Sequence, residues 1–380
     1  MSAAANPPLV LHVIHHLVIG GMENGLVNLI NRAPPSDFRH AIACVEDHSE
    51  FRDRLRRADV EVVSLHRSRI GVWGLRKALF RLCRRLRPAI LHTRNMSGLD
   101  ALLPARLAGV RRCLHGEHGW DIQDLHGSRL KPLLLRRLHA PLIDRYVAVS
   151  RHLEDYLVGR VGISRARISQ IHNGVDTARF TAAGVMPPDL PWTPEPAGKP
   201  FVFGTVGRVN QVKNQGSLLE AFAALLAASP ADADRLRLMI VGDGALLAEV
   251  RAKVGQMGLA GRVWLAGARH DIPGLMRAMD VFVLPSLNEG TSNTILEAMA
   301  TGLPVIAARV GGNPELLEPG TGLLYDHADG GGLVNAMRHY LRNPEVAKRD
   351  GEAGRARVVG QYSLDSMVGG YLQLYRDLSV

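Results

Sequence analysis

Cysteine is scarce in this 380-residue sequence: Cys44, Cys83 and Cys113 are dispersed, and none has C-x-x-C spacing. An odd, scattered set indicates free thiols in a reducing compartment rather than a disulfide framework. Long apolar runs are also missing. The first run, Leu9–Val18, has ten residues and three histidines, whereas a membrane helix needs ~20 apolar residues, and the run lacks the flanks of a signal peptide. We therefore expect a cytoplasmic protein.

Motifs of several other protein classes are missing as well. Gly20 and Gly21 follow the first apolar run in IGGMEN without completing the G-x-G-x-x-G pattern, which argues against hydride transfer. His115 and His118 are three residues apart in HGEHGWD, but no third ligand has metal-site spacing, so we expect no bound metal. No nucleic-acid-binding module is recognisable, and we expect no nucleic-acid partner.

Positive charge is concentrated in the first half of the chain. Residues 1–180 hold 28 Lys and Arg against 16 Asp and Glu, whereas the remainder holds 18 against 20. Such asymmetry indicates that one domain faces an anionic membrane, a nucleic acid or an acidic substrate. Residues 72–87, VWGLRKALFRLCRRLR, predict a basic amphipathic helix that can lie on an anionic membrane. Its leucines can equally pack on a sheet and leave a solvated basic face. The proposed lipid contacts are Arg76, Arg81, Arg84 and Arg85.

Short apolar runs alternate with helical-length amphipathic stretches throughout the sequence. This alternation predicts an α/β protein with parallel sheets. Because the chain is too long for one ordinary hydrophobic core, we expect two Rossmann-like domains that face a cleft. We place the first domain at 1–185, a proline-rich linker at 186–200 and the second domain at 201–362. Residues 363–380 have the spacing of a last helix.

The stretch 284–317, LPSLNEGTSNTILEAMATGLPVIAARVGGNPELL, carries the strongest functional signal. Its first residues end a predicted strand, and Thr291, Ser292 or Asn293 can cap a helix that reaches about Ala300. The N–H groups of such a helix start suit a phosphate. Two glutamates flank that position, and their carboxylates accept hydrogen bonds from sugar hydroxyls. The pair is Glu289 and Glu297.

Cations and cleft-facing polar residues follow other predicted strands. In GTVGRVNQVKN, Arg208 and Lys213 can stabilise a departing diphosphate. Gly20 and Gly21 allow backbone N–H groups to approach a phosphate. In HGEHGWD, His118 and Asp121 occupy positions from which a pair can face the cleft, whereas a structural role is expected for His115.

Together EGTSNTILEAMATGLPVIA, GRVNQVKN, VGDG at 241–244 and NGVD at 173–176 resemble the family-4 retaining glycosyltransferases over nearly the whole chain. The resemblance implies a GT-B fold, a last helix that returns to the first domain and metal-independent front-face displacement with retention. It implies no cofactor, because the nucleotide sugar is a co-substrate. A hexose would pass from a nucleotide diphosphate sugar, with a UDP-sugar favoured, to a glycan or lipid-linked acceptor.

The resemblance also assigns roles by position. The catalytic residues would be His118, Arg208, Lys213 and Glu289. The donor site would comprise Gly20, Gly21, Gly207, Asn214, Gly242, Arg269, Gly290, Thr291, Ser292, Asn293 and Glu297. The acceptor side would include Glu23, Asn95 and Asp121, although Glu23 stands where many relatives have a small residue.

The HTRN segment at 92–95 and HGEHG are further similar to sugar transferases of exosortase (PEP-CTERM) exopolysaccharide systems. This implies exopolysaccharide or cell-surface polysaccharide synthesis, and from the basic helix we expect a peripheral location at the inner face of the cytoplasmic membrane. Two other functions remain as alternatives: a GT-B epimerase or phosphorylase, and a basic non-catalytic protein that binds nucleic acid or membrane. The first lacks its acid–base or cofactor-lysine pattern, and for the second the donor motifs lie outside the basic half.

Overall fold

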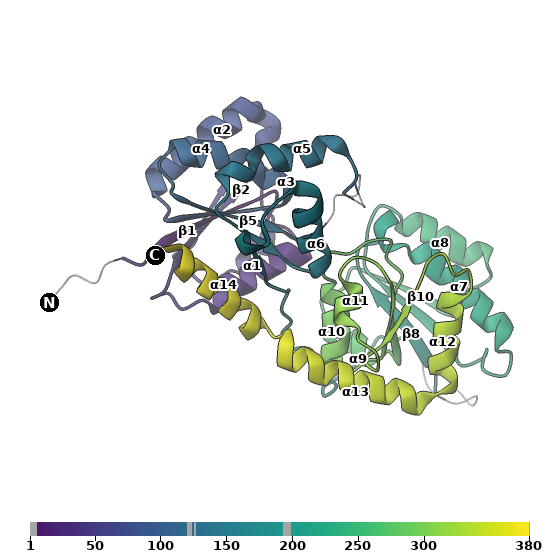
Figure 1. The fold of residues 1–380 in the computed structure, drawn as a ribbon. Coiled ribbons are helices and arrows are strands. Elements are labelled where there is room, and N and C mark those ends of the chain that lie inside the picture. The colour runs from purple at the N-terminus through teal and green to yellow at the C-terminus, as the bar shows by residue number, and fades with distance from the viewer. Residues whose placement is uncertain (1–5, 120–123, 125–126, 193–198, 380) are drawn as a thin grey trace. The chain divides into compact units, whose positions relative to one another are not determined.

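The computed structural model describes residues 6–119, 124, 127–192 and 199–379. The chain divides into two compact units, with Met1–Gly174 and Leu364–Val380 in unit 1 and Val175–Ser363 in unit 2. Each unit is built on its own parallel sheet, which confirms the predicted α/β class (Figure 1). None of the helices in the described ranges is both long and apolar enough to cross a lipid bilayer.

Unit 1 contains a seven-stranded parallel sheet in the order β3-β2-β1-β4-β5-β6-β7. Its central strand β1 reads LVLHVI and is buried along its whole length, as expected for a parallel strand covered on both faces. Val10 of β1 lies opposite His40 of β2 and Ile90 of β4. The strand bounds are β1 Leu9–Ile14, β2 Arg39–Cys44, β3 Glu61–Ser64, β4 Ile90–Arg94, β5 Arg112–Glu117, β6 Arg145–Ala148 and β7 Ile168–Gln170.

Helices cover both faces of this sheet. Helices α2, α4, α5 and α6 bury their apolar sides in one core with Leu9, Leu11 and Val13 of β1. The alternate residue Val10 packs instead with α1 and α14, so these two helices lie on the opposite face. The helix bounds are α1 Gly21–Arg32, α2 Arg67–Leu86, α3 Asn95–Gly98, α4 Leu102–Leu107, α5 Leu130–His139, α6 Arg151–Tyr156 and α14 Leu364–Ser379.

Single-turn helical segments complete unit 1. Four of them are 3₁₀ turns and one, η4, has π geometry at the end of α6. Their bounds are η1 Glu50–Arg54, η2 Leu99–Ala101, η3 Ala140–Leu142, η4 Leu157–Val161 and η5 Arg165–Arg167. Helix α2 begins before the predicted basic segment and is kinked at Gly71, which has a φ of 67°.

Unit 2 contains a six-stranded parallel sheet in the order β10-β9-β8-β11-β12-β13. The strand bounds are β8 Phe201–Val206, β9 Leu236–Val241, β10 Val263–Gly267, β11 Val281–Leu284, β12 Val305–Ala308 and β13 Leu323–Tyr325. The helix bounds are η6 Gln211–Lys213, α7 Gln215–Ala228, α8 Leu247–Gln256, α9 Ile272–Arg277, α10 Asn293–Thr301, α11 Asn313–Leu316, α12 Gly332–Arg342 and α13 Pro344–Gln361.

The boundary between the units differs from the placement at residue 185. Unit 1 ends at Gly174, because the following residues pack on unit 2: the N–H of Val175 donates to Tyr362 O, and Phe180 lies in the unit 2 core. The described part of the predicted linker is also packed. Leu190 and Trp192 contact the same core, since apolar side chains in a proline-rich segment still gain from burial.

Helix α13 fixes the far end of α10 through a glycine. A Cβ built on Gly351 would lie 2.2 Å from the carbonyl oxygen of Gly302, the residue that ends α10. Real Cβ atoms do not approach a backbone oxygen so closely, so a side chain at 351 would push the two helices apart. Gly360 lies on the same helix, is exposed and has no atom within 4 Å of its Cβ position.

We predict that Gly351→Ala lowers the free energy of unfolding by about 1–3 kcal/mol, the usual cost of overpacking. Gly360→Ala is the matched control and should be neutral or slightly stabilising, because alanine is the better helix former. Urea denaturation of both variants measures the difference. Equal stability of the two variants would contradict the close contact between α13 and α10.

Candidate active site

The loops that leave the carboxyl ends of the unit 2 strands are joined backbone to backbone. The N–H of Val209 donates to Asp243 O at 2.9 Å, which joins the loops after β8 and β9. The N–H of Leu287 donates to Val212 O at 2.7 Å, which joins the loops after β8 and β11. Neighbouring parallel strands end at one edge of the sheet, so these bonds hold the predicted donor residues in fixed positions.

Two glycines make this close packing possible. Gly242 has a φ of 136°, and a Cβ there would lie 2.0 Å from the oxygen of Gly207. Gly311 has a φ of 52°, and its Cβ would lie 1.7 Å from the oxygen of Glu289. A side chain at either position would be strained and would clash with backbone. The structure therefore brings the predicted residues Gly207 and Gly242 into contact and adds Gly311, which was not predicted from the sequence.

Lys213 and Glu289 form an ion pair at this edge. The Nζ of Lys213 donates to Glu289 Oε1 at 2.5 Å, and the hydroxyl of Ser286 donates to the same oxygen at 2.6 Å. The side chain of Asn210 accepts from the N–H of Lys213 and caps the short helix η6. Sequence spacing indicated the lysine and the glutamate separately, but their contact joins residues 76 positions apart. Ser286 lies inside the 284–317 motif and was overlooked there.

Helix α10 starts where the sequence predicted, and Ser292 caps it. The hydroxyl oxygen of Ser292 accepts from the N–H of Ile295 at 3.3 Å. Thr291 and Ser292 are buried, and the side-chain oxygen of Asn293 is buried without a partner among the described residues. The N–H groups of the first helical turn have no partner within the helix itself. This helix start can therefore hold an anion.

Glu297 projects from the second turn of α10 and is partly buried. Burial raises the pKa of its carboxyl to about 7, against the opposing charge of Arg179. A carboxyl group this costly to ionise is typical of a functional site. Arg179 lies near the start of unit 2, more than a hundred residues before Glu297 in the sequence. Sequence spacing therefore gave no indication that the two residues are close.

The remaining predicted donor residues have defined structural positions. Asn214 has a φ of 53° and is the cap residue of α7, and the backbone oxygen of Arg208 accepts from the Gln215 side chain. Gly290 lies in the loop between β11 and α10. Arg269 is held by two carboxylates, donating to Asp189 and Asp271 at 2.5–2.9 Å. Its predicted role in the donor site stays a prediction.

In unit 1, Asn95 connects two strand ends. It has a φ of 51°, and its side-chain oxygen accepts from the backbone N–H of His118 at 2.8 Å. Its amide nitrogen lies 3.8 Å from the sulfur of Met22 in the first turn of α1. The structure therefore brings together His118, Asn95 and the start of α1.

The start of α1 contains the two predicted phosphate-binding glycines. Gly20 is the cap residue and Gly21 is the first residue of the helix. A Cβ at Gly20 would lie 2.2 Å from a carboxylate oxygen of Glu23, so the Glu23 side chain folds back over the helix start. A carboxylate there is stabilised by the helix dipole. Asp121 lies outside the described residues.

A buried arginine of unit 1 forms hydrogen bonds with a cluster of histidines. Arg94 is 2% exposed, and its guanidinium lies 3.2 Å from Nδ1 of His12 and 3.4 Å from Nδ1 of His92. Arginine can only donate, so both Nδ1 atoms accept and the neutral rings carry their protons on Nε2. His12 then donates to Nδ1 of His40 at 3.0 Å, and Tyr375 of α14 donates to His92 at 2.8 Å. No spacing in the sequence indicated this network.

His118 is kept neutral beside the cluster. Burial, reinforced by the charge of Arg94, lowers the pKa of His118 to about 3. The Nε2 atoms of His118 and His92 both lie close to Gly116, since a Cβ built there would be 2.7 Å from the first and 3.5 Å from the second. Neither nitrogen has a hydrogen-bond partner among the described residues. A neutral imidazole can exchange hydrogen bonds with a hydroxyl at neutral pH.

His115 has a structural environment, as predicted. Its Nδ1 lies 2.8 Å from the Thr93 hydroxyl, and its Nε2 lies 3.4 Å from Glu117. Glu117 forms a buried ion pair with Arg136 at 2.6 Å. Although burial alone would raise it, the pKa of Glu117 is lowered to about 2 by Arg136 and His115. Among the described residues, no three His, Cys, Asp or Glu side chains gather in a metal-binding arrangement.

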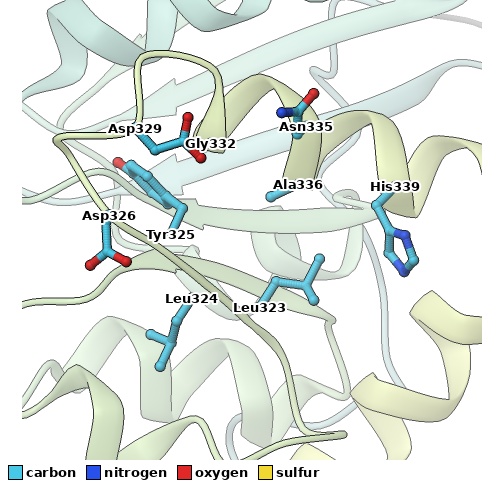
Figure 2. A pocket seen from close by; sticks show the side chains of 9 residues that line it. All are labelled: Leu323, Leu324, Tyr325, Asp326, Asp329, Gly332, Asn335, Ala336 and His339. Carbon is cyan, nitrogen blue, oxygen red and sulfur yellow. The ribbon is translucent and has the colours of Figure 1, made fainter.

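A cavity of about 310 Å³ opens elsewhere on unit 2, beside the edge strand β13 (Figure 2). Side chains of β13 and α12 line it, among them Tyr325, Asn335 and His339. None of the residues predicted for donor or acceptor binding belongs to its lining.

Comparisons with known proteins cover most of the chain. Residues 200–343 match the family described as "Glycosyl transferases group 1", and residues 19–179 match "Glycosyltransferase Family 4". An Escherichia coli protein named UDP-Gal:alpha-D-GlcNAc-diphosphoundecaprenol alpha-1,3-galactosyltransferase is 30% identical over 80% of this chain and 79% of its own length. A putative glycosyltransferase of Bacillus subtilis, EpsF, is 30% identical over 78% of each chain.

The fold is shared with solved structures at lower identity. HepE of Anabaena, crystallised with UDP and glucose, matches with a TM-score of 0.79 at 21% identity, over 97% of this chain and 99% of its own.

We predict that Glu297→Gln stabilises the protein at pH 8 by on the order of 1–3 kcal/mol and has little effect at pH 4. The folded carboxyl keeps its proton up to a pKa of about 7, whereas the unfolded chain loses it near pH 4.3. Folding therefore binds a proton between these values, and wild-type stability falls as pH rises. Urea denaturation at both pH values measures this. Glu249→Gln, an exposed control on α8, should show no such difference; an equal response of both variants would contradict the burial of Glu297.

Proposed function

This chain is a nucleotide-sugar-dependent glycosyltransferase of family 4 with the α/β GT-B fold, and we propose that it is a retaining enzyme that transfers a hexose from a UDP-sugar to a glycan or lipid-linked acceptor. The observation that carries this proposal is the arrangement of Lys213, Glu289 and the start of α10 at one edge of the unit 2 sheet.

The Lys213–Glu289 pair leaves hydrogen-bonding capacity for a donor. An ammonium group has three donors, and one of them is used toward Glu289. On Glu289, Oε1 receives both Lys213 and Ser286, whereas Oε2 can still accept from hydroxyls. We propose that the lysine donates to the diphosphate while Oε2 of Glu289 accepts from a hexose hydroxyl.

The proposed reaction leaves the anomeric configuration unchanged. The acceptor oxygen bonds to the anomeric carbon on the face from which the diphosphate departs, the bond from that carbon to the diphosphate oxygen breaks, and the acceptor's hydroxyl proton passes to the leaving phosphate oxygen. Arg208, Lys213 and the first N–H groups of α10 stabilise the charge that develops on the leaving oxygen, an effect that preorganised donors deliver most strongly. Glu297 accepts from the ribose hydroxyls. In unit 1, the neutral ring of His118 exchanges hydrogen bonds with a sugar hydroxyl. No side chain is assigned as a covalent nucleophile.

The identity of the donor is proposed from the relatives. The Escherichia coli enzyme is named for UDP-galactose, and HepE was crystallised with UDP and glucose. The same galactosyltransferase is named for an acceptor linked to diphosphoundecaprenol. We therefore propose a UDP-hexose donor, an acceptor from polysaccharide synthesis and a location at the inner face of the cytoplasmic membrane. The likeness of HTRN and HGEHG to transferases of exosortase systems favours exopolysaccharide.

We predict that Arg208→Ala and Lys213→Ala each reduce kcat by roughly 10²–10³, because each removes a cation from the developing charge. Release of UDP from UDP-hexoses in the presence of acceptor extract measures the rate, and thermal unfolding checks folding. The matched control is Lys253→Ala, which breaks the exposed Lys253–Glu220 pair of the same unit. Wild-type rates in a folded Lys213→Ala variant would refute the assignment.

We also predict that EDTA leaves the reaction rate unchanged. In the proposed site the diphosphate is neutralised by cationic side chains and helix N–H groups, while both glutamates bind sugar hydroxyls. Rates measured with EDTA and with added magnesium or manganese test this. Loss of activity in EDTA that either metal restores would mean that the carboxylates hold a metal instead.

A further inference from the structure

Three helices on one face of the unit 1 sheet contain no acidic residue. α2, α4 and α5 share one buried core, α2 packs against α4, and α4 contacts the turn η3 that follows α5 (Figure 1). Their sequences are RSRIGVWGLRKALFRLCRRL, LLPARL and LKPLLLRRLH. Because their apolar sides meet in one core, their outer sides form one surface of unit 1. We call this surface the three-helix face.

Large apolar side chains are exposed on the three-helix face. Leu130, Leu134 and Leu138 are 72%, 58% and 72% exposed and recur every four residues along one side of α5. Trp73 of α2 is 80% exposed and Leu107 of α4 is 70% exposed. A water-soluble surface rarely gathers such residues without a binding role. The leucines of α2 that the sequence pointed to are mostly buried in the core, whereas the exposed leucines of α5 were not predicted.

Cations lie among these apolar side chains. Lys77, Arg81, Arg84, Arg129 and Lys131 are exposed, and none of them forms an ion pair within the described part of the chain. Two of the four arginines proposed from the sequence as lipid contacts are already paired in the structure: Arg76 with Asp100 at 3.3 Å and Arg85 with Glu61 at 2.5 Å. Arg81 and Arg84 remain available.

We propose that the three-helix face docks on an anionic lipid bilayer, with Trp73 and the α5 leucines entering the interface and the five unpaired cations meeting lipid headgroups. Charge complementarity selects this occupant, because a second copy would set one predominantly cationic face against another. Apolar side chains flanked by cations are the combination that holds a protein in the bilayer interface. This inference rests on the proposed function only in that a lipid-linked acceptor would be met at the same surface.

The test is binding of the full-length protein to vesicles. We expect cosedimentation with vesicles of phosphatidylglycerol and phosphatidylcholine but not with phosphatidylcholine alone. Binding should fade as salt is raised, because at 1 M the screening length falls to ~3 Å. Tryptophan emission should shift to shorter wavelength on binding, and Trp73→Phe should abolish most of that shift.

Substitutions at exposed positions separate the contribution of the cations to membrane binding from that of the apolar side chains. Arg81→Ser with Arg84→Ser should weaken binding to anionic vesicles by roughly tenfold or more. The charge-matched control, Arg251→Ser with Arg342→Ser, removes two exposed cations from unit 2 and should bind like wild type. Replacing Leu130, Leu134 and Leu138 by Ser should also weaken binding, and should do so at all salt concentrations.

The docking surface would be overturned by wild-type protein that does not bind anionic vesicles at low salt, or by three-helix variants that bind as well as wild type. Self-association through this face without vesicle binding would also overturn it. Stabilisation by UDP, read as a rise in Tm, is measured in parallel. It should be unchanged in all these variants, so that a failure of docking is distinguished from a failure of the donor assignment.

Discussion

Backbone-to-backbone packing of the loops at the carboxyl edge of the unit 2 sheet is the constraint on which the candidate site depends. The loops after β8 and β11 are joined at Leu287 and Val212. Gly311 lets the loop after β12 approach the carbonyl of Glu289 to a distance that no side chain would allow. Lys213 and Glu289 meet because their loops are fixed in this way. The site is therefore preformed by the main chain, which lowers the reorganisation needed when a donor binds.

Both units bury polar groups in states that cost stability. Glu297 is desolvated without a hydrogen-bonded cation in the described residues, and its raised pKa records that cost. Arg94 lies in a core of neutral histidines rather than beside a carboxylate. Such groups are costly in a folded protein unless a ligand or a network uses them. For Arg94 that network is the histidines around it, and for Glu297 we propose the ribose hydroxyls of the donor.

Local patterns predicted the elements better than the contacts between them. The start of α10 at Ser292 follows from a cap residue before an apolar helix, and the parallel sheets follow from the alternation of strands and helices. The Lys213–Glu289 pair and the cluster around Arg94 join residues far apart in the chain, which no spacing reveals. The edge strand β13 could not have been predicted, because three residues after a glycine-rich turn carry too little periodicity. The boundary at Gly174 depends on packing of Val175 and Phe180, which is also a tertiary contact.

A crystal structure of the protein with UDP tests the central claim most directly. We predict that the ribose hydroxyls contact the Glu297 carboxylate, and that the diphosphate lies between Lys213 and the first N–H groups of α10. UDP bound in the cavity beside β13, or in unit 1 without contact to Lys213 and Glu297, would contradict the assignment of the donor site.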